Sequence, residues 1–456
     1  MRASRRVRTF AAFLVLLVSL AGACRDRAPE GIALVGGTVF DGSGGPPLRD
    51  AVIIVRGTQV ETIAPRANFD MPGRMEEIDI TGKWVIPGLI DAHAHVEPWA
   101  LDRYLVYGVT SVRNLHGPLD SILALRDRVK LGGQRGPRIY STGAMVDGTP
   151  PTYPDALGVT DPGSARRAVD SLVLRGVDGL KLYSRMDSAL LGAALDEART
   201  FNLKVTGHLG LTDALTAAAL GLRTMEHLSG VPEATRGGRE TLMAAHRRGF
   251  FSGWTAFARS WATLDSTELA RVAEGLAERQ VVLVPTLVLH ETLSRLGDSA
   301  LYQDPALKAV PARAIADWNT PDMIRRAGWG QGDFEAFARS LPAMDRFIRI
   351  FRAAGGIVAV GTDAVNQQLI PGESTHREME LLVRAGLAPE DALLAATRNG
   401  ALLIGADSIG TIAPGRVADL VVLNADPLSN IRNTKNIDRV MARGVFVPVD
   451  SLRAGW

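Results

Sequence analysis

The sequence predicts an α/β protein, namely a (β/α)₈ barrel of the TIM type with a small β-sandwich domain built from both chain ends. Two observations support this prediction. Between residues 86 and 405, short apolar segments alternate with helical ones, which is the pattern of a barrel of parallel strands. On both sides of this region lie β-rich segments that are too short to bury a core alone. An open doubly wound sheet is the alternative for the central region.

The barrel elements follow from this alternation of apolar strand-like and longer helical segments. The expected strands are 85–90, 110–112, 138–140, 179–183, 204–207, 223–226, 281–287 and 357–361. The expected helices include 164–175, 187–200, 212–220, 265–279, 335–353 and 376–385. The 47 glycines and 24 prolines suit a fold with many junctions between strands and helices.

The two chain ends supply the second domain. Residues 33–62 alternate β-rich segments with glycine-containing turns, and residues 410–423 and 440–446 repeat this pattern near the other end. Each set can bury its apolar face only by joining the other. We therefore assign 30–85 plus 406–448 to the small β domain and 86–405 to the barrel.

The charge of the chain is nearly balanced, because 51 basic residues face 49 acidic ones. The basic residues form no long cluster, so nucleic-acid binding has no support. At 456 residues and 46% hydrophobic, the chain is long enough for one large domain with an accessory one.

The first 23 residues are predicted to be a signal peptide. Arginines lie among residues 2–8, an apolar run follows over 10–20, and the small residues 21–23 form a cleavage site. This apolar run is too short for an ordinary membrane span. The prediction is a bacterial protein that is exported, either to the periplasm or to a membrane surface.

Cys24 is the only cysteine, so the chain cannot form an internal disulfide. The segment Leu20-Ala-Gly-Ala-Cys24 resembles a bacterial lipobox, in which the cysteine would carry a lipid. The match is imperfect, because Leu20 lies one position too far from the cysteine. Lipid anchoring through Cys24 and simple release are therefore both left open.

Polar residues with metal-binding side chains lie at the ends of several expected strands. His93 and His95 are one residue apart at the end of the first strand, so both point to the same side. Histidine is the commonest metal ligand, and the carboxyl ends of barrel strands meet at one mouth. The strand ends supply His93, His95, Lys181, His208, His227 and Asp363. These six residues would form a complete binuclear metal site.

Several segments resemble known proteins. VIPGLIDAHAH, DGLKLY, VTGHLG, TMEHLS and AVGTDA, with the tail GTIAPGRVADLVVLNADPL, are similar to the amidohydrolase superfamily, and in particular to its imidazolonepropionase-like and prolidase-like members. The resemblance covers nearly all of the mature chain. It implies two divalent metal ions, with zinc favoured, and a carbamylated Lys181 (N6-carboxylysine) that bridges them. It places His93, His95 and Asp363 around one ion and His208 and His227 on the other.

The chemistry of the lysine agrees with this role, because burial lowers the pKa of an amine and a neutral amine can react with carbon dioxide. The resemblance implies hydrolysis by a hydroxide that bridges the two metals. Asp363 would accept the proton of the attacking water and pass it to the leaving amine. Asp91, in the first strand, is expected to support the ligands from behind.

Three further residues are candidates for substrate binding at the mouth. Tyr183 lies two positions after Lys181 on the same side of its strand, where its phenol would bind a substrate carbonyl or carboxylate or pack at the rim. His116 and His290 follow the second and seventh expected strands, and either could reach the mouth.

Two more histidines lie in expected helices. His376 lies between Thr375 and Glu378, which look like a capping box, so a role at the helix start competes with substrate contact. His246 is expected to be a solvated helix residue.

The predicted reaction is hydrolysis of a C–N bond in a small molecule, a dipeptide or an N-acyl amino acid. The alternative is a lactone, ester or phosphotriester hydrolase with the same metals, and a metal-binding protein without turnover is a remote third. The aromatic-rich segment 230–280 would form a substrate lid, a contact in a homo-oligomer, or extra helices outside the barrel, and we prefer the last.

Overall fold

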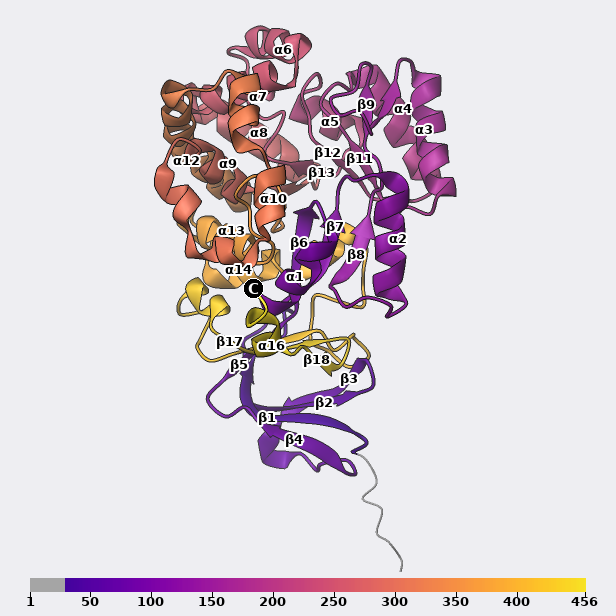
Figure 1. Ribbon diagram of the computed structural model, residues 1–456, viewed down its shortest axis with the longest axis vertical. Helices are drawn as coiled ribbons and strands as arrows, with labels where there is room; N and C mark the ends of the chain where they lie inside the picture. The colour runs from indigo at the N-terminus through magenta and orange to yellow at the C-terminus, as the bar shows by residue number, and fades with distance from the viewer. Residues whose placement is uncertain (1–28) are drawn as a thin grey trace, which may run out of the picture.

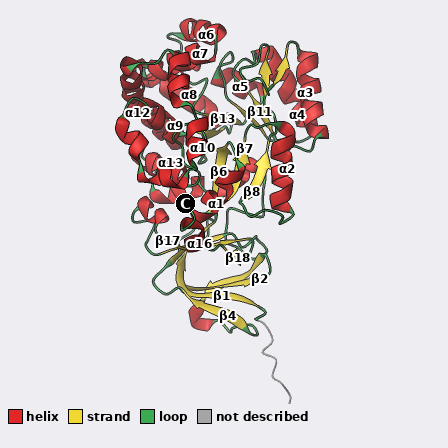
Figure 2. Cartoon of the chain, in the orientation of Figure 1, coloured by secondary structure: helices red, strands yellow, loops and turns green. Residues whose placement is uncertain are grey.

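The computed structural model describes residues 29–456 (Figure 1). The predicted signal peptide and Cys24 lie outside the described residues and stay predictions. None of the helices described is both long enough and apolar enough to cross a membrane. Figure 2 shows strands gathered at one end of the molecule and strands mixed with helices over the rest.

Both ends of the described chain build one sheet at the lower end of Figure 1. The sheet contains β1 (Gly31–Val39), β2 (Leu48–Arg56), β3 (Gln59–Pro65), β4 (Met75–Asp79), β5 (Trp84–Pro87), β16 (Leu420–Leu423), β17 (Ile437–Ala442) and β18 (Val445–Phe446). Its order is β18-β17-β16-β5-β1-β2-β3, with β4 paired to β1, and β5 runs antiparallel to β16. Hydrogen bonds join these strands into a single sheet, whereas a sandwich consists of two packed sheets, so the β-sandwich stays a prediction. The limits of the two domains stay predictions as well.

The remaining strands are parallel and form two sheets. One contains β6 (Leu89–Ala94), β7 (Val109–Asn114) and β8 (Arg138–Ser141). The other contains, in order, β10 (Leu157–Val159), β9 (Val146–Gly148), β11 (Leu180–Leu182), β12 (Val205–Gly207), β13 (Thr224–Glu226), β14 (Val282–Val284) and β15 (Ile357–Val358). The predicted α/β fold is thus confirmed, and the arrangement fits a TIM-barrel-like fold. β9 and β10 were not expected.

Helices separate and surround these strands. They are α1 (Leu101–Val106), α2 (Leu119–Lys130), α3 (Pro162–Leu174), α4 (Ser188–Thr200), α5 (Ala214–Leu220), α6 (Arg239–Arg248), α7 (Phe250–Ser260), α8 (Ser266–Glu278), α9 (Leu287–Ser294), α10 (Ala312–Asp317), α11 (Thr320–Ala327), α12 (Gln331–Ala353), α13 (Glu373–Arg384), α14 (Pro389–Ala395), α15 (Arg398–Ile404) and α16 (Val449–Arg453). Asp161, Asp187 and Asp265 cap the N-termini of α3, α4 and α8, which explains why these helices begin where the sequence predicts.

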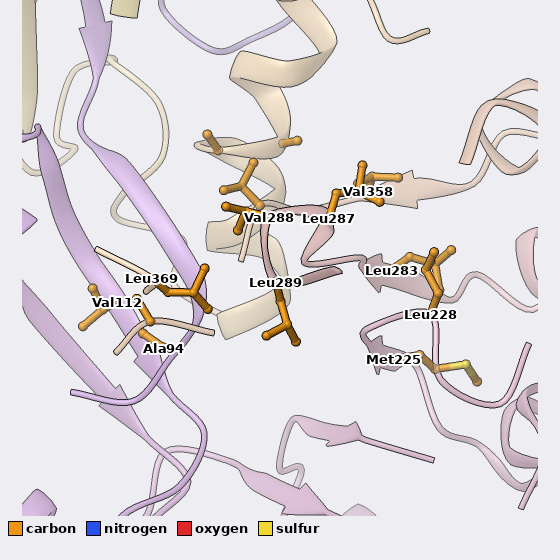
Figure 3. Packing of buried hydrophobic residues seen from close by; sticks show 14 of the residues in the cluster. Ala94, Val112, Met225, Leu228, Leu283, Leu287, Val288, Leu289, Val358 and Leu369 are labelled. Atoms are coloured by element: carbon orange, nitrogen blue, oxygen red, sulfur yellow. The ribbon is translucent and has the colours of Figure 1, made fainter. Parts of the chain in front are cut away.

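The apolar side chains of the strands pack against the surrounding helices. Figure 3 shows Val112 of β7, Met225 of β13 and Leu283 of β14 among these buried residues. In β11, Leu180 and Leu182 belong to the same core. Since side chains alternate along a strand, Lys181 between them points to the opposite face. Core packing therefore fixes the direction of the polar residues at the strand ends.

Candidate metal centre

Three of the predicted ligands lie together at the carboxyl ends of different strands. One side-chain atom each of His93, His227 and Asp363 lies within 4.8 Å of the other two. Oδ1 of Asp363 is 2.8 Å from Nε2 of His93 and 3.0 Å from Nε2 of His95. β6 carries His93, while His227 and Asp363 follow β13 and β15. The structure thus brings together residues from the first, sixth and eighth expected strands.

Lys181 and His208 complete the cluster, and both carry buried atoms without a partner. The ring of His208 lies 4.7 Å from that of His227, centroid to centroid. Nζ of Lys181 and Nδ1 of His208 have no hydrogen-bond partner among the described residues. Burial lowers the pKa of Lys181 to about 8. Burial, assisted by the charge of Lys181, also holds the pKa of His208 well below its ordinary value.

These properties fit divalent metal ions. Neutral imidazole nitrogens and a carboxylate are the ligand types of zinc and similar metals, and a histidine must be neutral to bind them. Buried polar atoms normally have hydrogen-bond partners. Bound metal ions, together with carbamylation of Lys181, would supply the partners that these two nitrogens lack.

Glu226 is a further residue of this centre, which the sequence reasoning missed. Its carboxylate is fully buried and lies 2.6 Å from Nδ1 of His93, and it accepts a hydrogen bond from Nη2 of Arg113 at 2.7 Å. Burial alone would raise the pKa of Glu226, but the charges of His93 and Arg113 outweigh it and lower the pKa to about 2. The carboxylate holds Nδ1 of His93, so that Nε2 faces Asp363. A glutamate inside a buried strand, directly before His227, was the available signal.

Asp91 joins β6 to the segment that carries Asp363. Its carboxylate accepts hydrogen bonds from Oγ1 of Thr362 at 2.6 Å and from the backbone N–H groups of Thr362 and His93. It therefore supports the backbone beside two predicted ligands, in line with the role expected for it.

Thr286, just before α9, and His290 of α9 hold His227 from two directions. Oγ1 of Thr286 lies 2.7 Å from Nδ1 of His227, and Nε2 of His290 donates to the carbonyl oxygen of His227 at 3.0 Å. His290 is buried against Trp254 and does not line the cavity that contains the ligand cluster, so its contact with substrate stays a prediction. The expected strand 281–287 extended too far, because β14 ends at Val284 and Leu287 already begins α9.

His376 does not reach the centre either. Its ring is fully buried, Nε2 donates to the carbonyl oxygen of Tyr107 at 2.9 Å, and Nδ1 lies 2.9 Å from Oγ1 of Thr434. The predicted capping box is also wrong, because α13 begins at Glu373 and Glu378 instead accepts hydrogen bonds from the first N–H groups of α9. His376 therefore packs α13 against the rest of the chain.

The burial of His376 predicts a pH dependence of stability. Burial lowers its pKa from 6.5 to about 4, so between these values the unfolded chain binds a proton that the folded chain does not. Its contribution is complete above 6.5 and is lost as the pH falls towards 4. At about pH 5 we expect the free energy of unfolding to fall by about 2 kcal/mol through this residue.

Urea unfolding of the wild type and of His376→Gln at about pH 7.5 and pH 5 measures this effect. The variant should be less stable at the higher pH, but it should lose less stability on acidification. An equal loss in both proteins would show that His376 does not titrate in this range.

A cavity of about 580 Å³ opens beside the ligand cluster. Tyr183 and His116 line it, whereas His290 and His376 do not. Nε2 of His116 donates to Oδ1 of Asp155 at 3.0 Å, and its Nδ1 accepts from the backbone of Met145 at 3.3 Å. Both nitrogens of His116 are therefore engaged, which leaves Tyr183 as the better placed of the two for a substrate.

The aromatic-rich segment 230–280 forms part of the cavity wall. Phe250, Phe251 and Trp254 of α7 line the cavity, while Phe257 and Trp261 are buried in the core. Helix α7 thus faces the cavity, and the three alternatives for this segment, namely extra helices outside the barrel, a lid and an oligomer contact, stay predictions.

His246, on the neighbouring helix α6, is not solvated. Its Nε2 lies 2.8 Å from the buried carboxylate of Glu233, and only 9% of its side chain is exposed. This contact ties α6 to the loop after β13.

Comparison with known proteins agrees with this geometry. Residues 84–447 match the sequence profile of the amidohydrolase family. An imidazolonepropionase of Pseudomonas syringae pv. tomato is 27% identical over 83% of this chain and 88% of its own length. A protein of Bifidobacterium longum described as a candidate prolidase has a TM-score of 0.69 and 25% identity, over 93% of this chain and 98% of its own. Ochratoxinase of A. niger has the same fold, with a TM-score of 0.64 and 19% identity over 91% and 96%. The chain therefore belongs to the amidohydrolase family and is a hydrolase that acts on carbon–nitrogen bonds.

Proposed function

We propose that the protein hydrolyses the amide bond of a small molecule, in particular a dipeptide or an N-acyl amino acid, and that it needs two divalent metal ions. One observation carries the proposal. A buried lysine whose Nζ has no partner among the described residues lies with four histidines and an aspartate, and all of them line one cavity. A structural metal site needs no such lysine and is normally closed to solvent.

Zinc is the preferred metal, and Lys181 would serve as N6-carboxylysine between the two ions. His93, His95 and Asp363 would hold one ion, and His208 and His227 the other. The pKa of about 8 favours carbamylation, because a larger share of this amine is neutral than in an exposed lysine. When bound, the two ions lower the pKa of a water molecule and polarise the scissile carbonyl.

The proposed roles require the parallel strands to form a closed barrel. Hydrogen bonds join β6, the first of these strands, to the segment that directly follows β15, the last. The N–H of Ala92 donates to the carbonyl oxygen of Val360 at 2.9 Å, and the N–H of Thr362 donates to that of His93 at 3.0 Å. We include closure of the barrel in the proposal, since it would bring His93 and Asp363 to the same mouth.

Asp363 is proposed to move the proton. Burial alone would raise its pKa, but the charge of His93 and hydrogen bonds from His93 and His95 keep it well below its usual range. The carboxylate is therefore ionised at neutral pH and able to accept the proton of the attacking water and then deliver it to the leaving amine. Nδ2 of Asn366 donates to its Oδ2 at 2.7 Å and fixes its orientation.

Tyr183 is proposed to bind the substrate. Burial raises its pKa well above the ordinary value, so the phenol keeps its proton and can donate a hydrogen bond to a carbonyl or carboxylate.

We expect Tyr183→Phe to raise KM roughly three- to tenfold with little change in kcat, since one hydrogen bond contributes about 1 kcal/mol. Steady-state kinetics measure this change. Tyr140→Phe, on β8, is the matched control. If the rate of Tyr183→Phe at limiting substrate equals that of the wild type, Tyr183 packs at the rim and does not bind the substrate.

The proposed function is tested by turnover of a pooled library of dipeptides, N-acyl amino acids, lactams and lactones, followed by mass spectrometry. The protein is loaded with zinc and bicarbonate and compared with a chelated sample. Loss of amides that stops on chelation is the expected result. Loss of lactones alone would favour the esterase alternative, and turnover that survives complete metal removal would contradict the metal-dependent mechanism.

A further inference from the structure

Helix α11 brings a largely exposed guanidinium to the cavity. Arg326 lines the cavity and 64% of its side chain is exposed. Its guanidinium makes no hydrogen bond within the part of the chain that the structure describes. The carboxylate of Asp322 lies 4.0 Å away, and its other oxygen is bound by Arg325. The hydrogen-bond donors of Arg326 are therefore available to a ligand.

Phe251 fixes the position of this guanidinium. Cζ of Arg326 lies 5.5 Å from the centroid of the Phe251 ring, which is within the range of a cation–π contact. Phe251 lies on α7 and also lines the cavity. An arginine supported in this way loses less freedom when it binds an anion than one that extends into solvent.

A row of aromatic rings leads from the ligand cluster to Arg326. The ring of Trp254 lies 5.4 Å from that of His208, the ring of Phe250 lies 6.2 Å from that of Trp254, and the ring of Phe251 lies 5.5 Å from that of Phe250. This aromatic row is an apolar wall with the predicted metal ligands at one end and the cation at the other.

Tyr153 lines the same cavity as Asp363 and Arg326. Its ring is 5.8 Å from the ring of Tyr183 and 6.3 Å from that of Phe250. Tyr153 therefore lies beside the aromatic row, on the wall of the cavity that Asp363 and Arg326 also line.

Apart from the predicted metal ligands, the other charged side chains that line the cavity are carboxylates, so Arg326 is the group that would bind an anion. Glu97, Asp155, Asp317 and Asp322 also line the cavity; Asp155 is already bound to His116, and Asp322 to Arg325. The pKa of Glu97 is raised by burial and by the charge of Asp317, so these two carboxylates act on one another. A substrate carboxylate would be repelled from them, whereas a guanidinium binds it through two parallel hydrogen bonds.

We propose that Arg326 binds the carboxylate of the substrate and that the aromatic row binds an aromatic or large aliphatic side chain. The substrate class is then an N-acyl amino acid or dipeptide whose leaving amino acid is bulky and apolar and carries a free carboxylate. This proposal depends on the proposed function for the position of the scissile bond, but the recognition of an anion by Arg326 is tested without turnover.

Calorimetric titration of the zinc-loaded protein with 3-phenylpropanoate and with 3-phenyl-1-propanol tests this recognition, because neither compound contains a bond that the enzyme hydrolyses. The acid should bind the wild type at least about tenfold more tightly than the alcohol. Arg326→Ala and Arg326→Gln should each weaken binding of the acid by about ten- to a hundredfold and leave binding of the alcohol unchanged. Arg339→Ala, which removes an arginine of α12 that is equally exposed but outside the cavity lining, should change neither.

Three results would overturn the proposal: equal loss of acid and alcohol binding in the Arg326 variants, equal binding of both compounds by the wild type, or binding of neither. Preference for 3-phenylpropylamine over the acid would also overturn it and would point to the carboxylates. Failure of the library experiment, with Arg326-dependent binding of the acid intact, would reject only the proposed reaction.

Discussion

Replacement of Lys181 by alanine should lower kcat/KM by roughly a thousandfold, which is about 4 kcal/mol of transition-state stabilisation. The reason is that the substitution removes the only side chain proposed to bridge the two metal ions. Lys181 is 2% exposed, so its loss leaves a small polar cavity at the strand end. The secondary structure should be retained, because Leu180 and Leu182 keep β11 packed in the core.

The measurement combines steady-state kinetics, the metal content of the dialysed protein and circular dichroism. Lys181→Ala should hold fewer than two ions, and added acetate with zinc should restore part of the activity by supplying a carboxylate in the space of the lost side chain. Lys204→Ala replaces an exposed lysine just before β12 and is the control. A fully active Lys181→Ala protein would remove the binuclear mechanism.

The substitution Asp363→Asn should lower kcat by about 10²–10⁴-fold, the range that general acid–base catalysis contributes. An amide cannot accept the proton of the attacking water, while its size preserves the packing near His93 and Asn366. KM should change less than kcat, since Asp363 acts on the water rather than on the bound substrate.

Single-turnover kinetics with the best substrate from the library separate this chemical step from product release. The control is Asp317→Asn, which removes an exposed carboxylate that also lines the cavity. Loss of one metal ion in Asp363→Asn, with activity restored at high zinc, would instead assign the residue to metal binding alone.

Sequence reasoning was most successful where a local pattern determines the structure. The polar strand ends 93, 208, 227 and 363 follow apolar segments whose packing dictates their direction, so their convergence followed from the alternation of strands and helices. The aspartate caps of α3, α4 and α8 fixed helix starts for the same reason.

The failures concern residues whose partners are distant along the chain. The partners of His376 are Tyr107 and Thr434, and Glu378 binds the start of α9 rather than its own helix. Glu226 on β13 and Arg113 on β7 form a buried pair between the two parallel sheets, which no spacing within one segment reveals. The wall formed by α7 and α11 also depends on tertiary packing, because the same aromatic residues would suit helices outside the barrel.

The pairing of Trp84 with Leu423 has a consequence for biosynthesis. The edge of β5 that receives β16 stays without its partner until almost the whole chain has left the ribosome. During that interval an apolar strand with free backbone groups is exposed to other nascent chains. Nascent chains stalled before residue 420 should therefore be prone to aggregation and to capture by chaperones, and release should depend on the last few dozen residues synthesised.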